Sequence, residues 1–379
     1  MVGSDFLTRK THEMIRLSVA DPSFATPAVV KNALSDALEK GLTHYCGTRG
    51  LDFLRKSISE SYLTRYGFEV DPTTQIIPTN GAGEGLYLIL QAITKDGDEI
   101  IIPDPTYHGF IHKLHHFGAK PIFVPLRARS DFRLDIDAIN SEVRERTKAI
   151  FLCNPNNPTG IVYGRDELQQ VGDILRENRH VLLILDECYS RILYDGVKYY
   201  HLLQDESLRD QILVVNSFSK TYAMTGWRLG YVIANQSHID RIASVAFDIR
   251  SSTNTAVQYA GAVALRSNPR DLELMVNEYR ARRNLMMDCL KGMNLSFPIP
   301  QGGFEIFANF RKYESSSSVL KTKLAQDAYV ETVAGSEFGP HGEGYLRLVF
   351  CVDRDKLIEG MDRIRYFLED KNDSQNEHF

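Results

Sequence analysis

A lysine stands where an apolar run gives way to polar residues. Lys220 follows such a run at residues 212–216, with Ser217 and Ser219 just before it and Arg228 further along. An unpaired ammonium group is costly to bury, whereas a lysine that forms a Schiff base with a carbonyl compound has a reason to lie there. The two hydroxyls and the arginine fork could hold a phosphate. Taken alone, a lysine and an arginine are more often surface groups.

Other polar and glycine-rich residues also follow apolar runs. Asp186 comes directly after one, although an isolated aspartate there is more often a helix cap or a turn residue. Gly81, Ala82 and Gly83 lie between a predicted strand and a predicted helix, where backbone amides and a helix N-terminus can bind phosphate. A dinucleotide-binding fingerprint would need a glycine where Leu86 stands, so that interpretation fails.

Short apolar runs alternate with segments of helical period between about residues 75 and 235. Most of these runs are continuously apolar, as expected for strands that helices cover on both faces. The predicted strands lie at residues 75–79, 99–103, 121–125, 149–153, 182–187, 212–216 and 230–234. Residues 165–178 predict an amphipathic helix between two of them. This order predicts a large α/β domain with a mainly parallel seven-stranded sheet, which binds ligands beyond the carboxyl ends of its strands.

The last third of the chain is richer in sequence of helical period. It predicts a long helix at 271–290, short strands near 304–308 and 345–350, and a loop at the serine run 315–318. We expect a smaller α+β domain there, which the first forty residues join. The expected boundaries are 41–280 for the large domain, and 1–40 with 281–379 for the small domain.

The composition excludes several classes of protein. A formal net charge of −5 gives no general attraction to nucleic acid or anionic lipid. No apolar run approaches the length of a membrane span, and residues 1–18 contain no apolar signal region. The five cysteines are scattered without a CxxC pair, which argues against a disulfide framework or a zinc site. We expect a cytoplasmic protein that binds no metal, membrane or nucleic acid.

At the string SFSKTYAMTGWRLG, residues 217–230, the sequence resembles the class I/II pyridoxal-phosphate-dependent aminotransferases of fold type I. The resemblance extends over nearly the whole chain, and the string NPNNPTG at 154–160 is equally specific. Weaker matching pieces are Asp21-Pro22, Tyr45 with Gly47 and Gly50, and residues 80–84, 105–107, 186–189 and 345–348. The resemblance implies the fold-type I fold, pyridoxal 5′-phosphate as the cofactor, an amino acid and a 2-oxo acid as substrates, and a homodimer with shared active sites.

The resemblance also implies a role for each residue around the cofactor ring. Lys220 would be the Schiff-base lysine and would move a proton, while Asp186 would keep the ring nitrogen protonated. Asn157 and Tyr189 match the positions that hydrogen-bond the ring's phenolic oxygen. Tyr107 matches the position whose aromatic ring stacks on the pyridine.

Further residues match the positions that hold the cofactor phosphate and the substrate. The phosphate groups would be the backbone of Ala82 and Gly83, the hydroxyls of Ser217 and Ser219, the guanidinium of Arg228, and Tyr45 from the neighbouring subunit. Arg347 matches the arginine that binds the substrate α-carboxylate, next to Asn157 and the loop of Ala20. An arginine in an alternating strand could equally form a surface ion pair.

Three positions depart from the common pattern. Ala20 stands where relatives usually have glycine, in the loop that closes near the substrate carboxylate. Gly83 stands where many have a hydroxyl residue, so one hydrogen bond to the phosphate is expected to be missing. Glu305 replaces an aromatic residue often seen after the turn before it. Ala20 and Glu305 could reshape the side-chain pocket.

The sequence therefore predicts an aminotransferase with a ping-pong mechanism. A lyase, synthase or decarboxylase of the same fold is the first alternative, because the motifs do not separate these reactions. A second alternative is a regulator that uses an aminotransferase-like domain as a ligand sensor. Such regulators carry a basic DNA-binding module before that domain, and the matching sequence here begins by about Leu17, which leaves no room for one.

Overall fold

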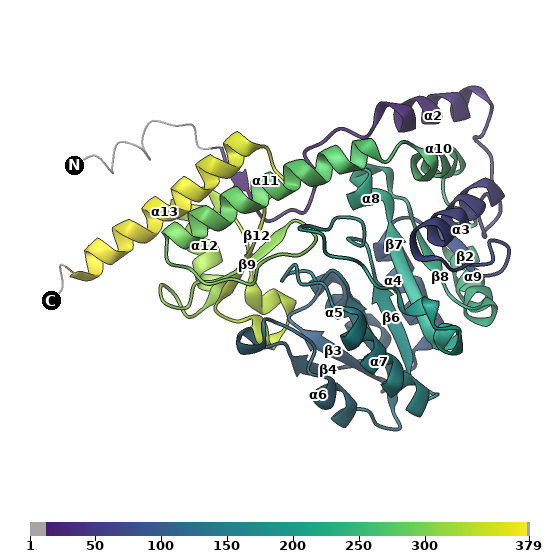
Figure 1. Ribbon diagram of the computed structural model, residues 1–379, viewed down its shortest axis with the longest axis horizontal. Helices are drawn as coiled ribbons and strands as arrows, with labels where there is room; N and C mark the ends of the chain where they lie inside the picture. Colours follow the sequence, from purple (N-terminus) through teal and green to yellow (C-terminus); the bar gives the residue numbers. More distant parts are fainter. Residues whose placement is uncertain (1–12, 377–379) are drawn as a thin grey trace.

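The computed structural model describes residues 13–376, with side chains described up to residue 370. Residues 1–12, which belong to the predicted small domain and to the segment searched for a signal, lie outside the described residues, as do residues 377–379. A twisted sheet occupies the larger part of the molecule, and a smaller group of strands and long helices lies beside it (Figure 1). Within residues 13–376, no helix combines the length and the apolar character needed to cross a bilayer.

The large sheet has seven strands in the order β2-β8-β7-β6-β5-β3-β4. Their bounds are β2 (Ile76–Thr79), β3 (Glu99–Asp104), β4 (Lys120–Pro125), β5 (Thr147–Cys153), β6 (Leu182–Asp186), β7 (Ile212–Ser217) and β8 (Gly230–Ile233). Neighbours are parallel except at β8, which runs antiparallel to both β2 and β7. The prediction of a mainly parallel seven-stranded sheet is confirmed, and each predicted strand lies within two residues of an observed one.

Helices cover both faces of this sheet. In β6, Leu183 and Leu185 belong to one hydrophobic cluster, whereas Leu182 and Ile184 belong to the cluster on the other face. A strand buried on both sides needs apolar residues at every position, which explains the continuous runs in the sequence. The surrounding helices are α3 (Asp52–Tyr66), α4 (Ala82–Ile93), α5 (His108–Leu114), α6 (Ile136–Ser141), α7 (Arg165–Glu177), α9 (Gln236–Arg250) and α10 (Thr255–Arg266).

A smaller α+β part packs around a third hydrophobic cluster. Its strands are β9 (Glu305–Asn309), β11 (Val333–Ala334) and β12 (Tyr345–Val349), which form an antiparallel sheet, with β1 (Ile15–Arg16) and β10 (Val330–Glu331) paired in parallel beside it. Its helices are α11 (Arg270–Gly292), α12 (Ser317–Asp327) and α13 (Arg354–Asn376). Helix α2 (Ala28–Glu39), which follows β1 in the sequence, lies away from α12 and α13, beside α10 (Figure 1). The predicted smaller α+β part is thus present.

The serine run at 315–318 differs from its prediction. The predicted loop at 315–318 is partly wrong, because Ser316 caps a helix and the described α12 begins at the next residue. The Ser316 hydroxyl accepts a hydrogen bond from the Val319 backbone amide at 3.4 Å, a capping role for which serine is well suited.

Helix α11 runs without a break across residue 280, the expected end of the large domain. The division at 40 and 280 therefore remains a proposal.

Candidate active site

One cavity of about 500 Å³ opens at the carboxyl ends of β5, β6 and β7. Twelve of the thirteen residues assigned to the site from the sequence line it: Ala20, Ala82, Gly83, Tyr107, Asn157, Asp186, Tyr189, Ser217, Ser219, Lys220, Arg228 and Arg347. The exception is Tyr45, whose side chain is 85% exposed and does not line the cavity of its own chain. Residues from positions 20 to 347 are thus brought into one space.

Lys220 lies on a one-turn helix, α8 (Phe218–Thr221), directly after β7. The Ser217 hydroxyl caps this turn by accepting a hydrogen bond from the Ser219 amide at 3.1 Å. The Lys220 ammonium donates a hydrogen bond to the backbone carbonyl of Ala20. Nearby, the Thr225 hydroxyl donates to the Asp21 carboxylate at 2.6 Å. The N-terminal segment is therefore in contact with Lys220 through Ala20, and with Thr225 through Asp21.

Asp186 ends β6, between β5 and β7, and is buried. One of its oxygens accepts a hydrogen bond from the Cys188 amide at 3.1 Å. Burial raises the pKa of the Asp186 carboxyl above its ordinary value, because the charged form is poorly solvated. A cation placed against this carboxyl would favour its charged form again. The position therefore suits a protonated ring nitrogen.

Tyr107 lines the same cavity as Asp186. Burial, and next the charge of Asp186, raise the pKa of its hydroxyl to about 12. The phenol therefore stays neutral near pH 7, and its ring offers a flat apolar face to a bound ligand.

The start of α4 forms a group of hydrogen-bond donors at the cavity wall. No side chain in the described part of the chain caps this helix, and its N-cap, Gly81, has a φ of 82°. The backbone at Ala82 and Gly83 lines the cavity, as do the hydroxyls of Ser217 and Ser219. Arg228 completes the group; its guanidinium donates to the carbonyls of Thr225 at 2.8 Å and Asn80 at 3.2 Å. A helix N-terminus, two hydroxyls and a guanidinium together suit a phosphate.

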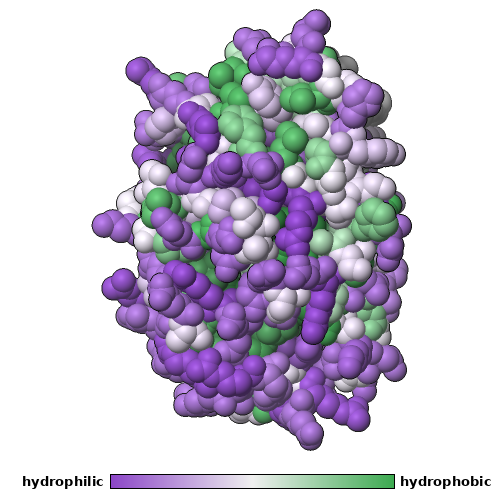
Figure 2. Space-filling view, turned by 90° about the vertical axis from the view of Figure 1, so that its right-hand side faces the viewer, coloured by the Kyte–Doolittle hydropathy of each residue, from purple (hydrophilic) through white to green (hydrophobic). Residues whose placement is uncertain are grey.

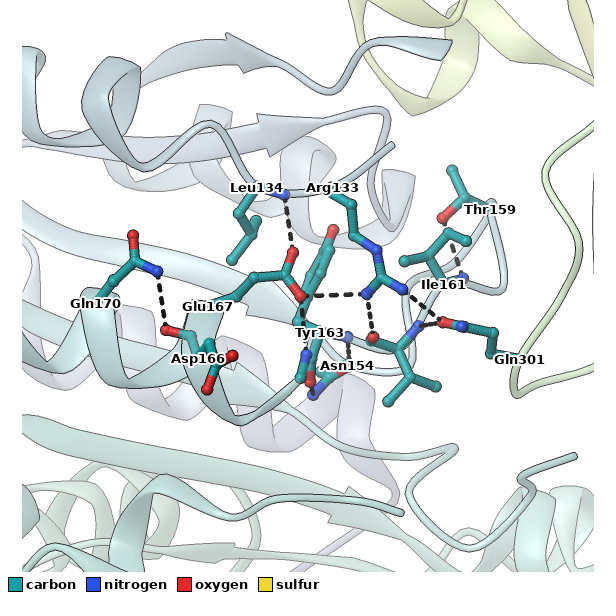
Figure 3. Close-up of polar contacts among 12 residues, drawn as sticks. Arg133, Leu134, Asn154, Thr159, Ile161, Tyr163, Asp166, Glu167, Gln170 and Gln301 are labelled. Atoms are coloured by element: carbon teal, nitrogen blue, oxygen red, sulfur yellow. Dashed lines mark hydrogen bonds and ion pairs between the residues drawn. The ribbon is translucent and has the colours of Figure 1, made fainter. Parts of the chain in front are cut away.

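Asn157 is carried by the loop after β5, which hydrogen bonds hold in shape (Figure 3). Asn154 pairs with the backbone of Tyr163 through both its side-chain oxygen, at 2.9 Å, and its side-chain nitrogen, at 3.2 Å. Arg133 donates to the Val162 carbonyl at 2.7 Å and to Glu167 at 3.1 Å. These contacts fix both ends of the loop, which fixes the position of the Asn157 amide.

Arg347 projects from β12, and only 4% of its surface is exposed. Its guanidinium donates to the Asn157 side-chain oxygen at 3.3 Å and to the Ser18 carbonyl, while its buried Nε has no partner. Among residues 13–370, no carboxylate forms an ion pair with it. The alternative of a surface ion pair is therefore wrong. A buried guanidinium without an anion is a site that can receive a carboxylate.

Some residues of the cavity were not singled out from the sequence. His108, Cys153 and Thr225 line it. Burial, and next the charge of Arg347, lower the pKa of His108 to about 4, so its imidazole is neutral near pH 7. Each of the three adjoins or lies within a motif, which is the only signal the sequence carries for them.

Comparison with known proteins identifies the family. The family model for aminotransferase class I and II matches residues 12–364. The chain belongs to this family. Aromatic-amino-acid aminotransferase 2 of Thermococcus litoralis is 36% identical over 363 residues, which cover 94% of this chain and 92% of that protein. Aspartate aminotransferase of Pyrococcus abyssi is also 36% identical, over 95% of this chain and 92% of that protein.

Solved structures agree with this aminotransferase assignment. An aromatic aminotransferase from Pyrococcus horikoshii has a TM-score of 0.92 and 34% identity, over 98% of this chain and 100% of that one. Aspartate aminotransferase from Thermus thermophilus with maleate has a TM-score of 0.88 and 28% identity, over 93% and 92% of the two chains. The fold is that of fold-type I, and the enzyme transfers amino groups. The lyase, synthase, decarboxylase and regulator alternatives are not favoured.

Proposed function

We propose that this aminotransferase uses pyridoxal 5′-phosphate to exchange an amino group between an α-amino acid and a 2-oxo acid. One observation carries the proposal: Lys220, Asp186 and the anion-free guanidinium of Arg347 line a single cavity. A lysine amine, a buried carboxyl group and a carboxylate receptor are the three groups that this chemistry requires. Turnover by two half-reactions predicts ping-pong kinetics.

The donors at the cavity wall fit the phosphate of this cofactor. The proposed phosphate ligands are the backbone amides of Ala82 and Gly83, the hydroxyls of Ser217 and Ser219, and the guanidinium of Arg228. Asp186 would face the ring nitrogen, Tyr107 would stack on the ring, and Asn157 and Tyr189 would lie near its phenolic oxygen. The lack of a side-chain cap on α4 and the raised pKa of the buried Asp186 both support this placement.

The cofactor, when bound, supplies an aldehyde that takes up the amino group and a ring that withdraws electrons from the substrate Cα. Lys220 Nζ would then act as the general base that removes the Cα proton, and as the general acid that delivers this proton to C4′ of the cofactor. Asp186 holds a proton on the ring nitrogen, because a buried carboxylate favours a neighbouring cation. Arg347 holds the α-carboxylate with two parallel hydrogen bonds, which fixes the direction of the Cα–H bond.

An absorbance spectrum tests the proposal directly. The purified protein loaded with pyridoxal phosphate is scanned before and after the addition of single amino acids. We expect a visible band that a suitable amino donor replaces with a band at shorter wavelength, and that a 2-oxo acid restores. A protein that gains no visible band after loading contradicts the proposal. A band that converts while ammonia and a cleaved fragment accumulate indicates a lyase instead.

Replacing Gly81 by alanine is expected to weaken cofactor binding. A Cβ at this position would lie 2.4 Å from an Arg228 nitrogen, and the φ of 82° is unfavourable for alanine. Displacing one or two charged hydrogen bonds costs a binding site about 10- to 100-fold in affinity. The dissociation constant of pyridoxal phosphate, from titration of the apoprotein, measures this loss.

Gly83→Ala is the matched control, because a Cβ there meets no atom within 4 Å. We expect its dissociation constant to stay within about threefold of the original value. Equal losses in the two variants would contradict the role given to Arg228.

We also propose that the enzyme is a homodimer in which Tyr45 reaches the phosphate of the partner's site. Tyr45 is exposed and lies in the segment between α2 and α3, beside residues 252–256 that follow α9. Exposed apolar residues lie on the same helices: Val29 and Leu38 on α2, and Phe247 and Ile249 on α9. Figure 2 views the side of the molecule that carries these helices and shows hydrophobic residues gathered in its upper half. Such exposed apolar surface supports a protein interface.

Sedimentation velocity is expected to give the mass of two chains. Replacing Phe247, which is 63% exposed, by aspartate is expected to shift the enzyme toward monomers, because burying an unpaired charge in an interface is costly. Activity should fall together with the dimer fraction. A wild-type monomer with full activity would contradict the role of Tyr45.

A further inference from the structure

The hydroxyl of Tyr189 already has a hydrogen-bond partner in this enzyme, and that partner is Glu305. Tyr189 donates to the Oε1 atom of Glu305, a residue 116 positions away. Both side chains are buried, with Glu305 fully buried and Tyr189 only 4% exposed. Tyr189 lines the cavity, whereas Glu305 lies behind it at the start of β9. The pair therefore forms one wall of the active site.

The backbone around Glu305 holds its carboxyl group in place. Its Oε2 atom accepts a hydrogen bond from the Phe304 amide at 2.9 Å. Both oxygens thus act as acceptors, as those of an ionised carboxylate do. Gly303 has a φ of 73°, and a Cβ on it would lie 2.6 Å from Oε2, so the turn is built around this carboxyl group. An aromatic side chain at position 305 could not accept the Tyr189 proton in this way.

We propose that Glu305 is a positioning residue that withdraws the Tyr189 hydroxyl donor from the phenolic oxygen of the cofactor. This inference rests on the proposed function, in which Tyr189 lies near that oxygen. A phenol has a single O–H group, so a proton directed at Glu305 is not available to a second acceptor. Tyr189 then offers the cavity only a lone pair. The charge of Glu305 also stays close to the bound cofactor.

Among the residues that the structure describes, Glu305 is the only hydrogen-bond acceptor of the Tyr189 hydroxyl. The titratable and charged groups around the pair include Arg347 of β12, Cys351 after β12, Cys153 of β5, Tyr194 after β6 and Lys220 of α8. Burial, and next the charge of Glu305 and the hydrogen bond to it, hold the pKa of Tyr189 well above its usual range. The hydroxyl therefore keeps its proton, and Glu305 remains its acceptor.

The pH midpoint of the visible absorbance band of the loaded enzyme tests the proposal. This midpoint reports the proton affinity of the linkage between the cofactor and Lys220. A nearby negative charge raises it, and so does the lack of a donor to the phenolic oxygen. Glu305→Leu removes the charge and frees the Tyr189 hydroxyl, so we expect the midpoint to fall by about one pH unit. Glu305→Gln keeps an acceptor and removes only the charge, so we expect a smaller fall.

A double-mutant cycle shows whether the two residues act together. In the wild-type background, Tyr189→Phe is expected to change the midpoint by less than about 0.3 pH unit. In the Glu305→Leu background the same substitution removes a freed donor, and we expect it to raise the midpoint by about one unit. Equal effects in both backgrounds would overturn the proposal.

Tyr194→Phe is the matched control for loss of packing. Tyr194 donates to the Gly303 carbonyl at 2.5 Å, so this variant disturbs the same turn without touching the pair. Its midpoint is expected to match the wild-type value. A shift as large as that of Glu305→Leu would overturn the proposal, because the effect would then come from the turn and not from the carboxyl group.

Binding gives a second readout that does not depend on turnover. Since Glu305 repels an anionic ligand, Glu305→Gln is expected to bind pyridoxal phosphate about two- to tenfold more tightly. If the affinity and the midpoint of Glu305→Gln both equal the wild-type values, the inference is overturned. The proposed function still stands in that case, provided that the wild-type protein forms the visible band. A wild-type protein that forms no band would overturn both.

Discussion

Replacing Lys220 by alanine is expected to remove nearly all transaminase activity. A positioned acid–base group contributes about 10²- to 10⁴-fold, and loss of the covalent step adds to this. We therefore expect kcat/KM for the best amino donor to fall by at least about 10⁴-fold. The fold should survive, because the only side-chain hydrogen bond of Lys220 among the described residues is the one to the Ala20 carbonyl.

Lys321→Ala is the control for this experiment. Lys321 lies on α12, outside the cavity, where it pairs with Glu337 at 2.7 Å. An exposed ion pair of this kind contributes at most about 1 kcal/mol to stability, so activity should stay within about twofold. Lys220→Ala protein that still gives the visible band, or that keeps more than about one hundredth of the activity, would show that another group performs the chemistry.

Replacing Arg347 by alanine is expected to lower kcat/KM for α-amino acids by about 10²- to 10⁴-fold. Each charged hydrogen bond to the substrate carboxylate contributes about 1.5–3 kcal/mol, and the guanidinium can form two. Cofactor affinity should change little, since the proposed phosphate ligands lie elsewhere. Steady-state kinetics with an amino acid, beside titration with pyridoxal phosphate, separates the two effects.

A primary amine that lacks the carboxylate provides the internal control. With the wild-type enzyme, this amine should react far more slowly than the corresponding amino acid. With Arg347→Ala, the preference for the amino acid should largely disappear, because the receptor for the carboxylate is gone. A variant that keeps the wild-type preference would place the carboxylate elsewhere in the cavity.

The sheet could be predicted because burial on both faces leaves a plain trace in the sequence. Every strand between β2 and β8 coincides with an apolar run. The direction of β8 leaves no such trace in the sequence. A strand that helices cover on both faces has the same apolar pattern whether it runs parallel or antiparallel to its neighbours. The prediction of a loop at the serine run 315–318, which overlaps the start of α12, failed for a related reason. Serine favours both loops and N-caps, and composition alone does not separate the two.

The site residues were predictable where they lie within contiguous motifs, such as the strings around Lys220 and Asn157. The contact between Tyr189 and Glu305 was not predictable, because it joins two elements that are distant in the sequence. The departure at Glu305 was visible in the sequence, but its partner was not. Only the fold shows that this carboxyl group takes the hydroxyl of a cavity residue.

The position of the N-terminal segment has a consequence for how the enzyme is made. Leu17 is held by the backbone of Glu331 and Val349, and Arg347 binds the Ser18 carbonyl across 329 positions of sequence. A ribosome adds about 5–20 residues per second, so the segment waits on the order of 15–65 s for its partners. During translation, Ile15 and Leu17 have nothing native to pack against, and the catalytic cavity lacks a wall. A nascent chain therefore gains its active site only after β12 has emerged.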